Sequence, residues 1–133
     1  MTAIARRRSR YTHDVEIDGT HTVVFDEPAE MGGDDAGASP TKMLAASLAA
    51  CTAITMEMYA DRKEWPLEDV EVSVDMQTPE GDTPRKFTVS IGLPKELSDD
   101  QRERLLKVAA KCPVHRALSD EGHVEIEDRV ELI

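Results

Sequence analysis

Aromatic residues are scarce in this chain, which has one tryptophan, two tyrosines and two phenylalanines among 133 residues. Its core must therefore be built from leucine, valine, isoleucine, methionine and alanine. Positive charge is also in short supply, because 27 Asp and Glu stand against 16 Lys and Arg, for a formal net charge of -11. Such a chain repels nucleic acid and anionic membranes, so neither is expected as a partner.

An apolar leader is missing as well. The arginines of residues 1–10 have no apolar run behind them, which excludes a secretory signal and predicts a cytoplasmic protein. Residues 43–60 carry one charge, Glu57. Alanine, serine and threonine dominate this stretch, and its length is the minimum for a membrane span, so a buried central helix explains it better.

The pattern along the chain predicts one α+β domain over residues 1–133, with residues 1–9 as a flexible tail or a lead-in to a strand. Asp18-Gly19 is a strong hairpin signal, and Ser39-Pro40 is a helix start in which a cap precedes proline. The element order is ββ-α-ββ-α-(α)-β. Strands are expected over 10–17, 21–25, 70–76, 86–93 and 124–127, the last reaching towards 130; helices are expected over 40–63, from 98 to Cys112, and from Pro113 to 118.

The predicted helix over 40–63 is apolar on nearly every face up to Ala60. A single sheet covers only one side of a helix, so a second layer or a partner subunit is implied.

Cys51 lies inside this alanine-rich helix. Its neighbours three and four residues away are apolar or weakly polar, and burial among them would raise a thiol pKa. The helix N-terminus is about three turns away, too far for its dipole to act. Taken alone, the helix favours a small core residue here, unless a cation reaches Cys51 from another segment.

Cys112 is the only other cysteine. It precedes Pro113, so it can cap a short helix whose free N–H groups favour a thiolate, and Lys111, His115 and Arg116 are close in sequence. Local electrostatics therefore predict that Cys112 is the more acidic thiol. The alternative is a helix breaker with a buried thiol.

Zinc is the other common use of Cys and His. Cys112 and His115 are three residues apart, and Cys51 and His123 could complete four ligands, but no paired cysteine motif is present. No metal or cofactor is therefore expected. A nucleophile-elbow sequence for a Ser-His-Asp hydrolase is also missing.

Several segments, in order, resemble the OsmC/Ohr family of peroxide-reducing proteins, at the level of its small OsmC-like branch. Each segment is weak alone, but the ordered set is specific and covers most of residues 20 to 120. The segments are residues 21–26 (HTVVFD), 31–40 (MGGDDAGASP), the alanine helix ending at 50–52 (ACT), 58–67 (MYADRKEWPL) and 111–115 (KCPVH).

The resemblance implies an intertwined homodimer whose long central helices pack between two antiparallel sheets. It implies that Cys51 is the peroxidatic thiolate, which an organic hydroperoxide oxidises to a sulfenic acid, and that Cys112 resolves it as a disulfide. A dithiol reductant, lipoyl-linked in some members, restores the thiols. The family binds no metal or cofactor at these cysteines.

The family also uses an arginine to hold the thiolate, paired with a glutamate just after the proline of the helix start. Here Thr41 and Lys42 follow Pro40, so the glutamate is absent or replaced from the loop. Arg10 is our choice for the arginine. Its rivals are Arg8 and Arg116; the loop acids are Glu27, Glu30, Asp34 and Asp35.

Two functions follow from the sequence. The first is a thiol-dependent peroxidase that reduces organic hydroperoxides in oxidative stress defence. The second is a non-catalytic OsmC-like dimer, small-molecule-binding or stress-associated, whose cysteines are structural. The missing glutamate is the best support for the second.

Overall fold

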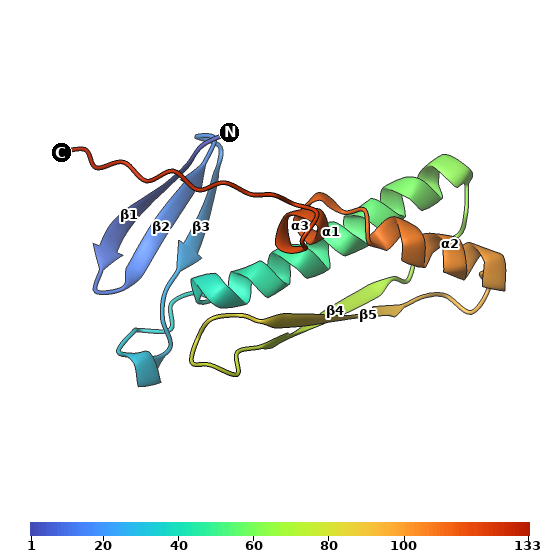
Figure 1. Ribbon diagram of the computed structural model, residues 1–133, viewed down its shortest axis with the longest axis horizontal. Helices are drawn as coiled ribbons and strands as arrows, with labels where there is room; N and C mark the ends of the chain where they lie inside the picture. Colours follow the sequence, from blue (N-terminus) through green and yellow to red (C-terminus); the bar gives the residue numbers. More distant parts are fainter. The chain divides into compact units, whose positions relative to one another are not determined.

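The computed structural model describes residues 1–133 and has an α+β fold, as predicted (Figure 1). The chain forms two compact units, residues 1–46 with 75–88 and residues 47–74 with 89–133. The single domain thus remains a prediction. The elements are β1 (Ala3–Ser9), β2 (Thr12–Ile17), β3 (His21–Phe25), the 3-10 turn η1 (Ala29–Met31), α1 (Pro40–Lys63), β4 (Glu71–Gln77), β5 (Lys86–Gly92), α2 (Asp99–Ala109) and α3 (Pro113–Leu118).

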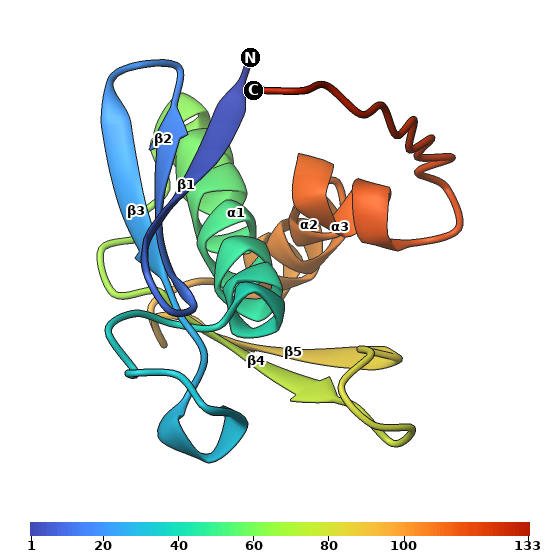
Figure 2. The ribbon, with the colours of Figure 1, turned by 90° about the vertical axis from the view of Figure 1, so that its left-hand side faces the viewer.

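The first unit is built on an antiparallel sheet with β2 between β1 and β3 (Figure 2). The predicted hairpin forms at Asp18 and Gly19, which both adopt the left-handed conformation, with φ of 51° and 70°. Residues 3–9 form a separate strand that pairs with β2, where a flexible tail or a lead-in to the strand over 10–17 was expected. β1 is exposed along its whole length.

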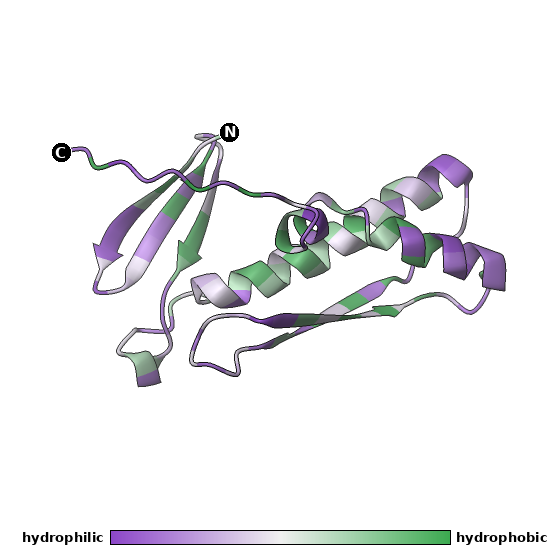
Figure 3. Cartoon of the chain, viewed as in Figure 1, coloured by the Kyte–Doolittle hydropathy of each residue, from purple (hydrophilic) through white to green (hydrophobic).

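Helix α1 begins at Pro40, as its sequence predicts, and Ser39 receives a weak cap bond from the Lys42 amide at 3.4 Å. The helix is apolar on most sides (Figure 3). By length and hydropathy it could cross a membrane, a test that core helices of soluble proteins also pass. Its buried residues are Leu48, Thr52, Met56 and Ala60.

An apolar stripe on α1 stays uncovered within this chain. Leu44, Ile54 and Met58 are 40%, 53% and 56% exposed. They recur at helical spacing, so they share one side of the helix. The exposure of these residues agrees with the expectation that one sheet cannot cover this helix.

The second unit has a small core between α1 and α2, which lie alongside each other in both ribbon views (Figures 1 and 2). Helix α2 begins with a reciprocal cap, in which the Ser98 amide donates to Gln101 Oε1 at 2.8 Å and the Gln101 amide donates to Ser98 Oγ at 3.2 Å. The core cluster consists of Met56, Ala60, Leu97, Leu105 and Ala109.

Strands β4 and β5 pair in a two-stranded sheet, and both show the predicted alternation of half-buried and exposed residues. Val72 and Ile91 point from these strands towards the core of the second unit.

The predicted last strand is wrong for the isolated chain. Residues 123–133 have no regular secondary structure. Val124, Ile126 and Val130 are 63%, 83% and 93% exposed. The alternation that predicts a strand is present, but nothing in this chain pairs with it.

We expect Leu105→Ala to lower the free energy of unfolding by about 2–5 kcal/mol, because Leu105 is fully buried and its truncation leaves a cavity. The adjacent Leu106 is 63% exposed and is a matched control, so Leu106→Ala should change stability by less than about 0.5 kcal/mol. Urea unfolding of both variants tests this. Equal losses would show that the cluster is not the core of this unit.

Candidate active site

Cys51 lies in the fourth turn of α1 and is half-buried. The helix positions it between the buried residues Leu48 and Thr52 and the exposed Ile54. Its sulfur is therefore held by a regular backbone while remaining within reach of a small solute.

Cys112 is completely buried. It caps α3, as predicted, and its Sγ accepts a hydrogen bond from the His115 amide at 3.3 Å. Its own amide donates to the Ala109 carbonyl at 3.3 Å. Because Ala109 belongs to the core cluster, the end of α2 fixes the position of the Cys112 sulfur.

The structure brings the two thiols together. Burial raises the pKa of Cys112, and the adjacent Cys51 thiol raises it further through a hydrogen bond and through its charge. The His115 amide lowers the pKa by less than burial and the Cys51 hydrogen bond raise it, and the Val114 amide has the smallest effect, also a lowering one. Both cysteines are free thiols in this structure.

The local prediction that the helix cap makes Cys112 acidic is therefore wrong. The cap exists, but full burial outweighs it, so the pKa of Cys112 rises rather than falls. Of the two alternatives for Cys112, the buried thiol at a helix break describes the structure better.

Thr52 is a feature that sequence reasoning missed. It follows Cys51, is 1% exposed, and its Oγ1 has no hydrogen-bond partner. A threonine among alanines gives no signal of this kind in the sequence, because its burial depends on packing between segments.

Arg10 lies in the first unit, in the turn between β1 and β2, with a left-handed φ of 48°. Its Nη2 donates to the Gly32 carbonyl at 2.5 Å, and its own carbonyl accepts from Arg7 Nε at 2.8 Å. Arg10 forms no ion pair with a carboxylate. Its guanidinium therefore has no charged partner.

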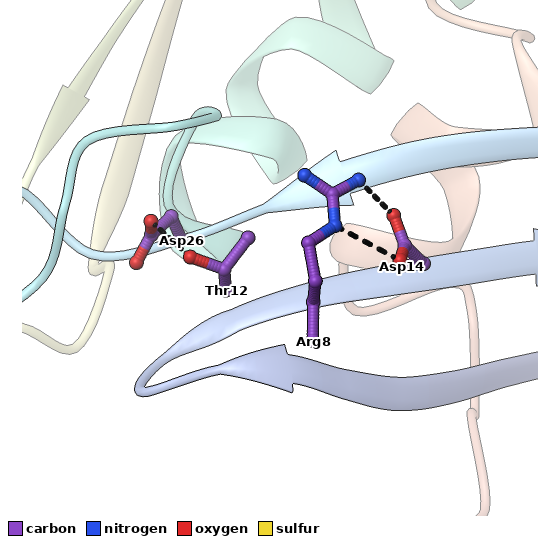
Figure 4. Close-up of polar contacts among 4 residues, drawn as sticks. All are labelled: Arg8, Thr12, Asp14 and Asp26. Carbon is purple, nitrogen blue, oxygen red and sulfur yellow. Dashed lines mark hydrogen bonds and ion pairs between the residues drawn. The ribbon is translucent and has the colours of Figure 1, made fainter.

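The other candidate arginines are in different situations. Arg8 is paired with Asp14 at 2.5 Å (Figure 4). The hydrogen bond and charge of Asp14 raise the pKa of Arg8. Arg116 is exposed on α3.

Asp26 organises the loop that reaches Gly32. Its carboxylate is 1% exposed and accepts hydrogen bonds from Thr12 Oγ1 at 2.7 Å (Figure 4), from the Glu27 amide at 2.7 Å and from the Ala36 amide at 3.1 Å. The Thr12 bond is the largest cause of a lowered pKa for Asp26. Gly33 is required here, since a Cβ on it would lie 1.9 Å from the Glu27 carbonyl oxygen.

The four loop acids do not replace the missing glutamate in this chain. Glu27, Glu30, Asp34 and Asp35 form no ion pair with any arginine, and Glu27 instead lines a cavity of about 500 Å³ in the first unit. The remaining walls of this cavity are mostly apolar and include Tyr11, Val15 and Phe25.

No group of three or more His, Cys, Asp or Glu side chains is gathered in a way that could hold a metal ion. The four residues that could form a zinc site by sequence are not assembled into one.

The fold and the thiols define an α+β protein with an adjacent pair of cysteines, one accessible and one buried. Residues 32–127 match the family of OsmC-like proteins. The chain belongs to this family, as its sequence motifs predict. No curated protein matches it closely.

Three solved structures with the same fold match this chain over about nine-tenths of its length and about nine-tenths of theirs. A protein from Psychrobacter arcticus, described in terms of osmotic stress induction and detoxification, is 20% identical with a TM-score of 0.79 and covers 91% and 90% of the two chains. The organic hydroperoxide resistance protein OsmC from Legionella pneumophila is 26% identical with a TM-score of 0.60, and the match covers 91% of each chain. OhrB of Bacillus subtilis, an organic hydroperoxide resistance protein, is 23% identical with a TM-score of 0.55, and the match covers 90% of this chain and 92% of OhrB.

We expect Asp26→Asn to destabilise the first unit at neutral pH, because an amide cannot accept all three hydrogen bonds and its NH₂ group opposes the backbone donors. The lowered pKa means that the carboxylate stabilises the fold above its unfolded pKa, and that this contribution is lost as the pH falls through the folded pKa. Thermal melts at pH 7 and in steps below pH 4 should show the difference between wild type and variant shrinking with acid.

The exposed loop residue Asp82 is the control for Asp26, and Asp82→Asn should leave the melting temperature unchanged at every pH. A difference between wild type and Asp26→Asn that stays constant down to the lowest pH would contradict the proposed role of the carboxylate.

Proposed function

We propose that this protein is a thiol-dependent peroxidase that reduces organic hydroperoxides, with Cys51 as the peroxidatic cysteine and Cys112 as the resolving cysteine. The observation that carries the proposal is the difference in access between two adjacent thiols. Cys51 is partly exposed, whereas Cys112 is completely buried. A peroxide from solution can reach the first sulfur and not the second.

The chemistry has three steps. The Cys51 thiolate attacks the hydroperoxide, so that an S–O bond forms, the O–O bond breaks, and an alcohol leaves after taking up a proton. Cys112 then loses its proton and attacks the sulfenic acid sulfur, and water leaves as the disulfide forms. A dithiol reductant, of which a lipoyl-linked one is a candidate, supplies two electrons and restores both thiols.

The raised pKa of Cys112 suits the second role. A thiol that stays protonated does not compete for the peroxide, and it is consumed only when a sulfenic acid forms beside it. The names of the Legionella and Bacillus relatives, both organic hydroperoxide resistance proteins, support the substrate class.

Arg10 is the proposed cation for the Cys51 thiolate. A half-buried thiol in the middle of a helix gains no thiolate stabilisation from the helix termini, so the cation must come from another segment or another subunit. Arg10 fits because its guanidinium has no carboxylate partner and holds only the Gly32 carbonyl.

A homodimer is the proposed assembly. The uncovered residues Leu44, Ile54 and Met58 form an apolar stripe on α1, and the half-buried Cys51 lies between them in sequence. A second copy packed on this stripe would remove it from water and close the surroundings of Cys51. We propose that the dimer acts in the cytoplasm.

A non-catalytic role is the second candidate. The absence of a glutamate after Pro40 and the apolar cavity of about 500 Å³ favour a protein that binds a small molecule and uses its cysteines structurally. Catalytic consumption of peroxide, with both thiols regenerated, is expected of the peroxidase and not of the non-catalytic protein.

We expect Cys51→Ser to abolish consumption of cumene hydroperoxide in the presence of a dihydrolipoyl reductant. With the reductant left out, Cys112→Ser should consume about one equivalent and stop with a sulfenic acid on Cys51 that dimedone traps and mass spectrometry detects. Stopped-flow assays with the wild type alongside test both. If the Cys51→Ser protein consumed peroxide as fast as the wild type, the peroxidase proposal would be rejected and the non-catalytic role would remain.

Arg10→Gln should slow the reaction of Cys51 with peroxide at pH 7 by about tenfold or more, since a loss of one pKa unit in thiolate stabilisation corresponds to a factor of ten. Stopped-flow oxidation by the same hydroperoxide measures this rate. Arg8→Gln is the discriminating variant, because Arg8 already holds Asp14. A loss in Arg8→Gln with none in Arg10→Gln would reassign the cation.

A further inference from the structure

Thr52 carries a buried hydroxyl group that nothing in the fold uses. The residue is 1% exposed, and its Oγ1 has no hydrogen-bond partner. A threonine inside a helix can bind the carbonyl four residues earlier, but the Leu48 carbonyl does not hold this hydroxyl. The other buried polar side chains, Thr12, Asp26 and Ser39, all take part in hydrogen bonds. A buried polar group without a partner costs stability, because it gives up its bonds to water and receives none in return.

The position of Thr52 on α1 brings it level with the end of α2. The two helices lie alongside each other and run in opposite directions in both ribbon views (Figures 1 and 2). Trp65, just after α1, lines one groove together with Asp100 at the start of α2. Met56, further back along α1, belongs to the same core cluster as Leu105. Thr52 is one turn before Met56, so it is level with the last turn of α2.

Cys112 lies at this end of α2. Leu105, Ala109 and Cys112 recur at helical spacing, and the bond from the Cys112 amide to the Ala109 carbonyl continues the last turn of the helix. Cys112 is completely buried and adjacent to Cys51, the residue before Thr52. A fully buried thiol and a fully buried hydroxyl therefore occupy the same level of the packing between α1 and α2.

The resolving step needs a further hydrogen-bond donor at this level. Cys112 must lose its proton before it attacks Cys51, and burial favours the protonated form. The His115 amide already donates to the Cys112 sulfur at 3.3 Å, yet its effect does not outweigh burial. A hydroxyl can stabilise a thiolate without bringing another charge into the core. A protonated thiol is only a weak acceptor, so in the resting protein such a hydroxyl stays unpaired.

We propose that Thr52 is the hydroxyl donor that stabilises the Cys112 thiolate during the resolving step. Threonine has two accessible χ1 rotamers in a helix, so Oγ1 can turn towards the Cys112 sulfur without moving the backbone. The hydroxyl gains a partner in the same step in which the sulfur gains its charge, and this gain favours the attack. The assignment rests on the proposed role of Cys112 and concerns only the second of the two thiol reactions.

Exchange with dithiodipyridine measures the two thiol reactions separately and without peroxide. The Cys51 thiolate attacks the aromatic disulfide, so that a mixed disulfide forms on Cys51 and the first thiopyridone leaves. Cys112 then loses its proton and attacks the Cys51 sulfur; the protein disulfide forms, and a second thiopyridone leaves and takes up a proton. Stopped-flow absorbance shows the two releases as two phases when the reagent concentration makes the first phase the faster.

We expect Thr52→Val, which keeps the shape of the side chain and removes its hydroxyl, to slow the second phase by about tenfold or more. This is the ratio expected for the loss of one hydrogen bond to a charged group. The first phase should not change, and Thr52→Ser should restore most of the second. Thr55→Val is the matched control, because Thr55 is one turn beyond Cys51 on α1 and only half-buried, and it should change neither phase. A second phase at the wild-type rate in Thr52→Val would overturn the assignment.

Thermal melts of the same variants distinguish the proposed role from a structural one. Removal of an unpaired hydroxyl should leave the melting temperature of Thr52→Val at or above that of the wild type. A lower melting temperature would show that the hydroxyl already has a structural partner in the resting protein. That result would also overturn the assignment.

The outcome for the peroxidase is separate. Two-phase release by a wild type that consumes no hydroperoxide would reject the enzyme, and a slow second phase in Thr52→Val would still support Thr52 as the donor to Cys112. Release of one equivalent only by the wild type would reject the resolving role of Cys112 and the assignment of Thr52 together.

Discussion

The packing of α2 onto α1 is the constraint on which the thiol pair depends. Leu105 and Ala109 of α2 meet Met56 of α1 in a core with no exposed side chain. The Cys112 amide binds the Ala109 carbonyl, so the cysteine follows directly from the last turn of that helix. A shift of α2 along α1 by one turn would separate the sulfurs by more than a disulfide can span. The core therefore sets the distance on which any resolving step relies.

Burial at this point has two opposing consequences for Cys112. It protects the thiol from solvent oxidants and raises its pKa, so that the sulfur is a poor nucleophile in the resting protein. It also holds the sulfur beside Cys51, so that a sulfenic acid formed there meets a thiol at very high effective concentration. Slow intrinsic reactivity and close placement together favour a thiol that reacts with its neighbour and with little else.

Local sequence signals were sufficient for most elements and insufficient where tertiary contacts decide. Ser39-Pro40 and Asp18-Gly19 located the start of α1 and the β2–β3 hairpin, because caps and turns depend on adjacent residues. The alternation over 124–130 identified a strand-like pattern but could not supply a pairing partner. The acidity expected of Cys112 failed for a related reason, since desolvation depends on what packs over the sulfur. The pairing of Cys51 with Cys112 came from family motifs and could not have come from spacing.

The proposed activation of Cys51 by Arg10 depends on how the chain assembles. A thiolate inside an apolar helix needs a cation, and the helix itself has none near it. The Arg10 guanidinium donates to the Gly32 carbonyl, in the loop that the buried Asp26 carboxylate holds through the Glu27 and Ala36 amides. A carbonyl stabilises a guanidinium without neutralising its charge, whereas a glutamate would do both. A chain that lacks the family glutamate can thus still present a full positive charge at Arg10, and in the proposed homodimer a second copy would supply further groups around it.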